Sequence, residues 1–251
     1  MSFKPVVVIP VYNHPLTIGA MVQGVREHTG LTCILVNDGS SAECKNVMDG
    51  LVTSDTAHVQ VLDLPVNQGK GAAMMAGLRL AMQQGFTHAV QIDADGQHRT
   101  QDIPRLLEQA KAHPKDMVCG APVYDASVPK GRFYGRYATH IWVWINTLSF
   151  EIKDSMCGFR VYPLAATVAL FDRVRLGTRM DFDTEVLVRL HWHGVRMQTV
   201  MTQVTYPQDG VSHFDVWRDN LKISRMHAQL FVGMLLRSPY LAARNALRWL
   251  R

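Results

Sequence analysis

The stretch AVQIDADGQH, residues 89–98, decides the fold of this chain. It begins with a short, mainly apolar run, Ala89–Ile92, and becomes polar at Asp93. A short apolar run that stops at a polar, glycine-containing turn is typical of a buried strand in an α/β sheet. The stretch therefore predicts a buried strand that ends in an acidic loop.

The same arrangement recurs through the first 120 residues. Short apolar runs end in polar or glycine-rich loops, and helical patterns lie between them. The other predicted strands are Val6–Val11, Thr32–Val36, Val59–Leu64 and Met117–Cys119, and the helical stretches are Leu16–Glu27, Ala42–Leu51, Ala72–Gln84 and Ile103–Ala112. This alternation predicts an α/β fold with a mostly parallel sheet covered by helices on both faces. Because ligands bind at the carboxyl ends of such strands, the polar loops predict one shared site.

Composition excludes several classes of protein. With 251 residues, 47% hydrophobic and 19% charged, the chain can bury a large core and is not disordered. Its 18 glycines, 11 prolines and four cysteines exclude collagen-like and disulfide-scaffold proteins. The cysteines are far apart, as expected for reduced thiols in a cytoplasmic protein. We expect no export signal and no membrane-spanning helix, since no apolar run approaches about 18 residues.

The excess of positive charge lies at the C-terminal end. Residues 215–251 contain two acidic residues and seven basic ones, namely Arg218, Lys222, Arg225, Arg237, Arg244, Arg248 and Arg251. We therefore expect a catalytic domain over residues 1–214 and a basic, amphipathic helical extension over residues 215–251. Such an extension favours an anionic partner, which charge alone does not identify.

Asp93 and Asp95 carry the strongest chemical signal. Two carboxylates one residue apart at a strand end suit Mg²⁺ or Mn²⁺, which prefer oxygen ligands and share them with substrate phosphates. Gln97 or His98 is placed to add a ligand or to hold a metal-bound water. The alternative is an ordinary acidic turn, which the position after an apolar strand makes less favourable.

Two other loops bear on the same site. Asp38, in the sequence NDGSS of residues 37–41, is placed to accept a hydrogen bond from a nucleobase, although a helix cap at Ser40 or Ser41 is the simpler reading. Lys70, within Gly69–Gly71, either approaches a phosphate or is a solvated turn lysine. The spacing is not that of a P-loop nucleotide-binding protein.

Five stretches in a fixed order resemble the family 2 glycosyltransferases of the GT-A type, and most closely the dolichyl- or polyprenyl-phosphate mannose or glucose synthases. The resemblance covers roughly residues 4–214. The matching stretches are VIPVYN (8–13), VNDGSS (36–41), NQGKG (67–71), DADGQH (93–98) and DSMCGFRVY (154–162). The family's pattern usually has an acidic residue after Tyr-Asn, where this chain has His14.

The resemblance implies a role for each matching residue on the donor side. Residues that would bind the nucleoside-diphosphate sugar are Pro10, Tyr12, Asn13, Asp38, Lys70, Asp93 and Asp95. Residues that would hold Mg²⁺ or Mn²⁺ are Asp93, Asp95 and Gln97.

On the acceptor side, the resemblance places Arg160 near the anionic groups at the reaction centre. Asp183 and Glu185 match the position of the family's acidic residues. A phosphate acceptor is already ionised, whereas a hydroxyl acceptor requires Asp183 or Glu185 as a base. The alternative for Glu185 is a helix carboxylate paired with Arg189 at i+4. The resemblance thus implies a catalytic set of Asp95, Arg160, Asp183 and Glu185.

Two basic segments suggest a lipid-linked acceptor. A basic loop, Pro129–Arg136, precedes an aromatic helix over Tyr137–Phe150, and the resemblance implies that Lys130, Arg132 and Arg136 meet the acceptor phosphate. In Ser238–Arg251, one helical stripe is apolar and another is basic, which is typical of a helix at a membrane surface. The alternatives are a core helix after a solvated loop, and a tail packed on its own domain or a partner subunit.

Together these patterns predict an inverting, metal-dependent glycosyltransferase that moves a hexose from a nucleoside-diphosphate sugar to a polyprenyl phosphate or glycolipid. It would act from the cytoplasm, peripherally on the inner face of the membrane. A glycosyltransferase that uses a hydroxyl acceptor is an alternative. A nucleotidyltransferase or sugar-nucleotide-binding protein is another, and a nucleic-acid-binding module is disfavoured because no such motif is present.

Overall fold

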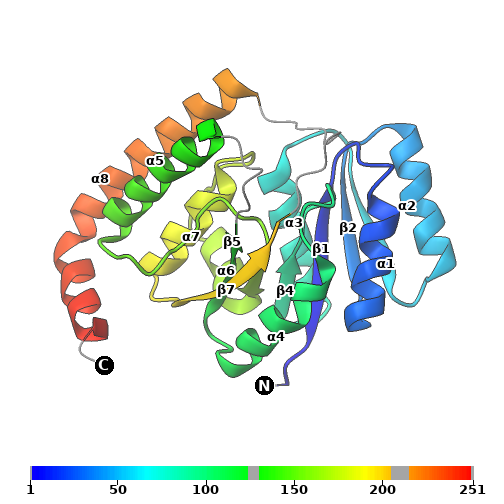
Figure 1. Cartoon of the computed structure of the whole chain (residues 1–251), viewed down its shortest axis with the longest axis horizontal. Coiled ribbons are helices and arrows are strands. Elements are labelled where there is room, and N and C mark those ends of the chain that lie inside the picture. Colours follow the sequence, from blue (N-terminus) through cyan, green and yellow to red (C-terminus); the bar gives the residue numbers. More distant parts are fainter. Residues whose placement is uncertain (1, 124–129, 205–214, 250–251) are drawn as a thin grey trace.

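A seven-stranded sheet forms the centre of the protein (Figure 1), with the strand order β3-β2-β1-β4-β6-β5-β7. The structure is a computed structural model that describes residues 2–123, 130–204 and 215–249, with residues 130–138, 216 and 249 described through their backbone alone. The strands are β1 (Pro5–Val11), β2 (Cys33–Asp38), β3 (Val59–Leu64), β4 (His88–Gln91), β5 (Met117–Val123), β6 (Arg160–Pro163) and β7 (Met197–Gln203).

The sheet is mostly parallel, as the sequence predicts. The exception is β6, which lies antiparallel between β4 and β5. All five predicted strands are present, and β6 and β7 are additional. The insertion of β6 brings Arg160 directly opposite Gln91 of β4, so two polar side chains meet in the middle of the sheet.

Helices cover both faces of the sheet, because the strands are apolar on both sides. On one face lie α1 (Ile18–Thr29), α2 (Ala42–Ser54) and α4 (Ile103–Ala112). A 3₁₀ turn at Thr100–Asp102 precedes α4. On the other face lie α3 (Lys70–Gln83), α6 (Leu164–Phe171) and α7 (Phe182–Trp192). Each set buries its own apolar cluster against the sheet.

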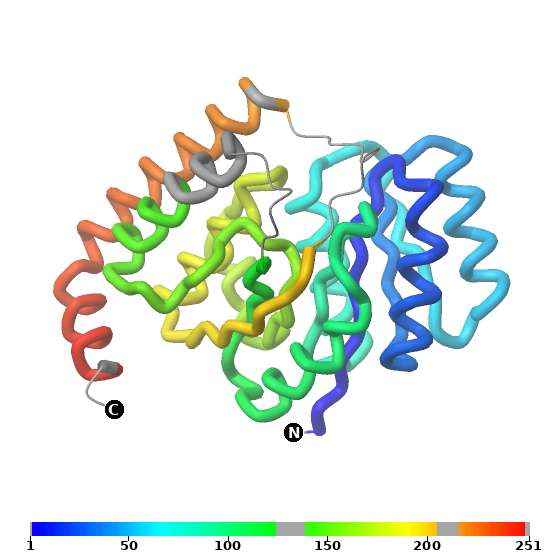
Figure 2. The backbone as a smooth tube through the Cα atoms, in the orientation of Figure 1, coloured from blue at the N-terminus to red at the C-terminus, as the bar shows by residue number. Residues whose placement is uncertain are grey.

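Two further helices, α5 (Lys130–Thr147) and α8 (Val216–Trp249), run side by side outside α7 (Figures 1 and 2). The ring of Trp142 meets that of Phe231 edge-on, with 6.0 Å between centroids. The indole of Trp192 donates to the carbonyl of Asn146 and so joins α7 to α5. The prediction of a basic loop before a helix at Tyr137 is wrong, because α5 already begins at Lys130 and ends at Thr147.

The C-terminal helix α8 packs on the rest of the protein. Its buried side chains Met226, Leu230, Met234 and Leu241 belong to the same apolar cluster as the core of α7. Arg237 stacks on the Trp192 ring, 4.9 Å from the ring centroid. Among the described residues, no helix is both long enough and apolar enough to cross a bilayer.

Candidate active site

The ends of β1 and β2 are tied together by Asn13. Its backbone has a φ of +56°, a left-handed conformation that asparagine tolerates better than most residues. In this conformation the Asn13 N–H donates to the Ser40 hydroxyl at 3.1 Å, and the Asn13 Oδ1 accepts from the Ser41 N–H at 2.7 Å. Pro10 and Tyr12 lie half-buried beside it at the end of β1. The predicted donor-side residues of this strand therefore border the edge where the polar loops meet.

Asp38 organises the loop that leads into α3. One carboxylate oxygen accepts from the Gln68 N–H at 2.7 Å, and the other accepts from the Gly69 N–H at 2.8 Å and the Asn67 amide at 3.0 Å. Burial raises the pKa of Asp38, although the backbone donors oppose that shift. Asp38 thus shapes the 67–69 loop, and its contact with a nucleoside stays a prediction.

Lys70, the first residue of α3, is the centre of the site. Together with Asp93 and Asp183 it forms a cluster that we call the Lys70 group. Its Nζ lies 2.8 Å from Asp93 Oδ2 and 2.8 Å from Asp183 Oδ2, although the three side chains are far apart in the sequence. Burial opposes the ammonium charge, but the two carboxylates outweigh it and raise the pKa of Lys70. Of the two readings that the sequence left open, the solvated turn lysine is wrong.

Asp93 and Asp95 retain unused capacity for a cation. The Asp93 Oδ1 is buried without a hydrogen-bond partner, which is costly for an ionised oxygen. Burial and the nearby Asp93 charge raise the pKa of Asp95 to about 6. A divalent cation relieves both conditions, because it supplies a partner for the oxygen and offsets the repulsion.

The predicted metal ligands therefore fit Mg²⁺ or Mn²⁺. Gln97 is half-buried, and its backbone N–H donates to Asp95 Oδ1 at 3.0 Å. The described residues contain no group of three or more His, Cys, Asp or Glu side chains arranged around a metal position. Two carboxylates and an amide agree with the preference of Mg²⁺ for few protein ligands completed by water and substrate phosphates.

Arg160 lies beneath this group and is fully buried. Its Nη1 donates to the Asp183 carbonyl at 2.6 Å, and its Nη2 donates to the Ser155 carbonyl at 2.8 Å. These bonds join the start of α7 to the turn before β6. Arg160 thus supports the backbone that carries Asp183, and its predicted contact with phosphate groups stays a prediction.

The structure separates the two acidic residues of the acceptor side. Asp183 faces Lys70, whereas both oxygens of Glu185 are engaged elsewhere. Glu185 Oε2 accepts from the Gly177 N–H at 2.7 Å, and Oε1 pairs with Arg189 at 2.7 Å. The paired-carboxylate alternative therefore describes the contacts of Glu185, and of the two residues only Asp183 belongs to the Lys70 group.

Gln91 and Tyr162 lie next to the Lys70 group, although the sequence patterns do not indicate them as site residues. Both are fully buried, and the Tyr162 hydroxyl donates to Gln91 Oε1 at 2.7 Å. The Gln91 Nε2 donates to Asp183 Oδ1 at 3.3 Å. The sequence signal for Gln91 is an amide within the otherwise apolar run Ala89–Ile92, just before the acidic loop.

The side chains of the basic residues predicted to meet the acceptor phosphate lie outside the described part of the structure. Lys130, Arg132 and Arg136 lie in the first turns of α5, and their side chains are not among those that the structure describes. Their predicted contact with a phosphate stays a prediction.

Two arginines near the end of α8, Arg244 and Arg248, are directed inward. Arg244 Nη1 donates to the His191 carbonyl at 2.5 Å, and Arg248 Nη2 donates to the Gly194 carbonyl at 2.6 Å. Arg248 Nη1 also contacts Glu151 Oε2 at 3.2 Å. The prediction that these two arginines form a membrane-facing stripe is therefore wrong, because α8 uses them to attach to its own domain.

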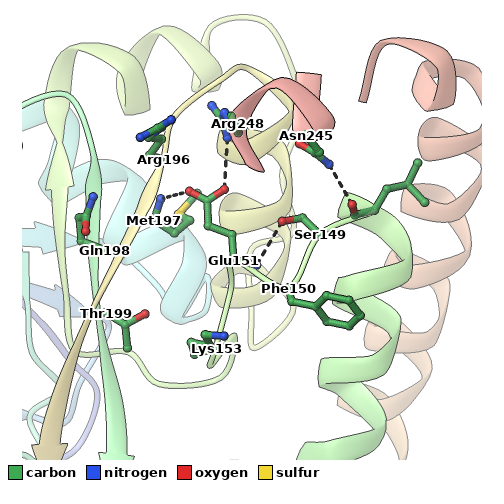
Figure 3. Close-up of a pocket in the computed structure, with 11 residues that line it drawn as sticks. Ser149, Phe150, Glu151, Lys153, Arg196, Met197, Gln198, Thr199, Asn245 and Arg248 are labelled. Atoms are coloured by element: carbon green, nitrogen blue, oxygen red, sulfur yellow. Dashed lines mark hydrogen bonds and ion pairs between the residues drawn. The ribbon is translucent and has the colours of Figure 1, made fainter. Parts of the chain in front are cut away.

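A cavity of about 630 Å³ lies beside this attachment (Figure 3). Arg248 and Asn245 of α8 face Glu151 and the loop after α5, with the first residues of β7 on the opposite side. Burial opposes ionisation of Glu151, but His191 and the Met197 N–H lower its pKa. The cavity is separate from the Lys70 group.

Comparison with known proteins gives a consistent result. The model of the family described as "Glycosyl transferase family 2" matches residues 6–174. The undecaprenyl-phosphate mannosyltransferase of Micrococcus luteus is 28% identical over 166 residues, which cover 62% of this chain and 64% of that protein. The chain thus spans slightly less than two thirds of this relative.

A second relative and a solved structure extend the match. The UDP-N-acetylglucosamine–dolichyl-phosphate N-acetylglucosaminyltransferase of Methanococcus voltae is 24% identical, over 78% of this chain and 85% of that protein. The crystal structure of glucosyl-3-phosphoglycerate synthase from Mycobacterium tuberculosis, in complex with Mn²⁺, UDP and phosphoglyceric acid, has a TM-score of 0.68 at 14% identity and covers 93% of this chain and 78% of that one. At this identity the structural likeness concerns the fold alone, and it confirms the predicted fold class.

Proposed function

Because this chain belongs to glycosyl transferase family 2, we propose that it is an inverting glycosyltransferase that moves a hexose from a nucleoside-diphosphate sugar to a polyprenyl phosphate. The observation that carries the proposal is the buried group of Lys70, Asp93 and Asp183 beside an unpartnered carboxylate oxygen. The M. luteus and M. voltae relatives are named for transfer to polyprenyl or dolichyl phosphates, which supports this acceptor class.

The residues of the site suit the departure of a diphosphate. Asp93, Asp95 and Gln97 would hold Mg²⁺ or Mn²⁺, which when bound offsets the charge of the leaving diphosphate. Lys70 remains protonated between its two carboxylates and adds a fixed positive charge next to them. Pro10, Tyr12, Asn13 and Asp38 would border the nucleoside.

The state of Asp183 favours a phosphate acceptor over a hydroxyl. Its two carboxylate oxygens are engaged by Lys70 and Gln91, so neither is free to take a proton without breaking a buried contact. A phosphate acceptor is already ionised and needs no base. In this reading Asp183 holds Lys70 and orients the acceptor side.

We further propose that the enzyme docks peripherally on the cytoplasmic face of an anionic membrane, through a surface different from the predicted arginine stripe. This surface, the α5–α8 face, joins exposed apolar side chains of two neighbouring helices. They are Ile141, Trp142 and Ile145 of α5, and Leu221, Val232, Leu235, Leu236, Tyr240 and Leu247 of α8. Exposed apolar patches of this kind mark interaction sites.

Charge on the α5–α8 face favours an anionic bilayer. Arg218, Lys222 and Arg225 are exposed on the N-terminal turns of α8, and Asp219, the one acidic residue of that helix, is buried. A cation near an anionic membrane surface contributes about 1 kcal/mol of attraction. Apolar area and basic charge on one helical surface together suit an interface.

Transfer of labelled sugar tests the activity. The protein is incubated with Mn²⁺ or Mg²⁺, a panel of nucleoside-diphosphate sugars, and either polyprenyl phosphate or the corresponding polyprenol. We expect transfer from one donor to the phosphate and none to the polyprenol. Tight binding of a donor with no transfer to any acceptor would instead indicate a sugar-nucleotide-binding protein.

Sedimentation with vesicles tests the docking surface. We expect the protein to sediment with vesicles that contain acidic lipid and to be released by high salt. Leu236→Asp, in the α5–α8 face, should weaken sedimentation, whereas Met82→Asp, an exposed apolar position on α3, should not. Equal binding by both variants would contradict the assignment, and light scattering that detects a dimer lost in Leu236→Asp would assign the surface to a second copy.

A further inference from the structure

Two uncharged side chains lie in the sheet directly beneath the Lys70 group. Gln91 ends β4, and Tyr162 lies on the antiparallel neighbour β6, two residues away from the direct partner of Gln91. Both are 0% exposed. Residues diagonal to each other on paired strands are within reach when one of them is long or aromatic. The insertion of β6 into the sheet is therefore what brings the two side chains together.

The hydrogen-bond chemistry fixes the orientation of the Gln91 amide. Asp183 Oδ1 only accepts, so the group of Gln91 that faces it at 3.3 Å is the NH₂. The amide oxygen then faces Tyr162, whose hydroxyl donates to it at 2.7 Å. Burial raises the pKa of Tyr162, so the hydroxyl keeps the proton that it donates. In this series of hydrogen bonds, the donor and acceptor of each bond fix those of the next.

Gln91 also completes the set of contacts around Asp183. Lys70 engages Oδ2, Gln91 engages Oδ1, and Arg160 holds the main-chain carbonyl. Gly158 leaves space for this arrangement, because a Cβ there would lie 2.8 Å from Lys70 Nζ and 2.9 Å from Gln91 Nε2. Arg160 Nη1 also lies 3.6 Å from Oδ1. Without Gln91, Oδ1 would keep only this longer ion pair, and the carboxylate could rotate away from Lys70.

We propose that Gln91, oriented by the Tyr162 hydroxyl, is a positioning residue that fixes the Asp183 carboxylate against Lys70 in the geometry that sugar transfer requires. The inference rests on the proposed function, since it assigns Gln91 a part in that reaction. Gln91 and Tyr162 act through Asp183 and are not expected to touch the substrate.

Tyr162→Phe tests the proposal, because it removes the hydroxyl and keeps the ring. We expect kcat to fall about tenfold or more, in line with the cost of misplacing a group at a reacting centre. The KM for the donor should stay within about twofold, since the donor residues are not altered. Gln91→Glu is expected to lower kcat more than Tyr162→Phe does, because it adds a third carboxylate next to Asp93 and Asp183.

Val161→Ala is the matched control. Val161 is the neighbour of Tyr162 on β6, is equally buried, and packs on the opposite face of the sheet. Its substitution loosens the core without touching the amide, so its kcat should stay within about twofold. If kcat falls in parallel in Tyr162→Phe and Val161→Ala, or in neither, Tyr162 has no positioning role and the proposal fails.

A measurement that needs no turnover separates this inference from the proposed function. The side-chain NH₂ of Gln91 should give slowly exchanging ¹⁵N-detected resonances in the wild type, because it is buried and bonded to a carboxylate. These resonances should shift and exchange faster in Tyr162→Phe, and not in Val161→Ala. If the wild type transfers no sugar and this signature is present, the proposed function fails and the orientation of Gln91 by Tyr162 stands. If the signature is absent, the positioning inference fails.

Discussion

Two groups of charged side chains in this protein make a useful comparison: the group around Lys70 at the edge of the sheet, and the group around Glu151 that attaches α8. In the second, the oxygens of Glu151 are engaged by the Met197 N–H on one side, and by His191 and Arg248 on the other. In the first, Asp93 Oδ1 has no partner, and Asp95 carries a pKa of about 6. The Glu151 group is complete without a ligand, and the Lys70 group is not.

The difference shows that positive charge in the sequence is a weaker guide to function than unused bonding capacity. The C-terminal tail carries the excess positive charge of the sequence, yet its Arg244 and Arg248 bind their own domain. Asp93 and Asp95 lie in a chain region of ordinary charge. Burial makes the ionised Asp95 and the unpartnered Asp93 Oδ1 costly unless a further cation binds. Substitutions around Lys70 should therefore lower mainly activity, and substitutions around Glu151 should lower mainly stability.

The largest expected effect is a loss of turnover when the Asp95 carboxylate, one of the two placed for a cation, is removed. Asp95→Ala should lower sugar transfer about a thousandfold or more, because it deletes one of two carboxylates placed for the metal. The fold should remain intact, since the side chain lies in a loop. Steady-state transfer assays with Mg²⁺ and Mn²⁺ measure the effect. Asp49→Ala, on the exposed side of α2, is the control, and near-normal turnover in Asp95→Ala would mean that this carboxylate is no metal ligand.

A smaller loss is expected for Arg160→Lys, of about 30- to 100-fold in kcat. The guanidinium bonds two carbonyls at once, those of Asp183 and Ser155, and a lysine ammonium cannot reproduce that fork. Misplacement of Asp183 then reduces the rate. Kinetic assays together with thermal unfolding distinguish the two effects, because unchanged kcat with a lower melting temperature would give Arg160 a purely structural role.

The third prediction concerns stability and pH. In the folded protein the pKa of Asp95 is about 6, raised from an ordinary 3.8. The folded state holds this proton more tightly, so the contribution of Asp95 favours folding below about pH 4 and is lost as the pH rises through 6. Asp95→Asn should therefore be more stable than the wild type at pH 8, by about 1–3 kcal/mol, and equally stable at pH 4.

Urea unfolding at the two pH values measures this effect. Addition of Mn²⁺ at pH 8 should stabilise the wild type and not Asp95→Asn, because a ligand that binds only the folded state raises its stability. Asp49→Asn serves as the surface control. A stability difference of the same size at pH 4 and pH 8 would rule out the titration of Asp95 as its cause.

Sequence patterns anticipated the fold well where a single local rule applies. Runs such as Val6–Val11 are rich in β-branched residues and end in a turn, so they predict strands directly. The strand β6 was missed because its four residues include a buried arginine and a proline, and only its neighbours make it a strand. The start of α5 was missed because Pro129, Gly131 and Gly135 are typical of a loop.

The candidate site was predicted in part. The acidic loop and Lys70 were identified because the chemistry of each lies in a few consecutive residues. Local patterns do not distinguish Asp183 from Glu185, since both open the same helix and only the packing of α7 against α3 brings one of them to Lys70. Likewise, an amphipathic pattern in α8 does not reveal which face another part of the protein covers.

The smallest effect is expected in the Glu151 group, and it should be on stability alone. Arg248→Met removes the contacts of Nη1 with Glu151 and of Nη2 with the Gly194 carbonyl, while it keeps most of the apolar stem. Loss of a partly buried charge pair of this kind costs about 1–2 kcal/mol in the free energy of unfolding. Since α8 lies on the far side of α7 from Lys70, kcat with a soluble short-chain polyprenyl phosphate should stay within about twofold.

Urea unfolding and transfer assays on the same preparation measure both quantities, and Arg218→Met, an exposed arginine on the same helix, should change neither. A large loss of kcat in Arg248→Met at unchanged stability would contradict the comparison, because it would mean that the anchor of α8 takes part in the reaction.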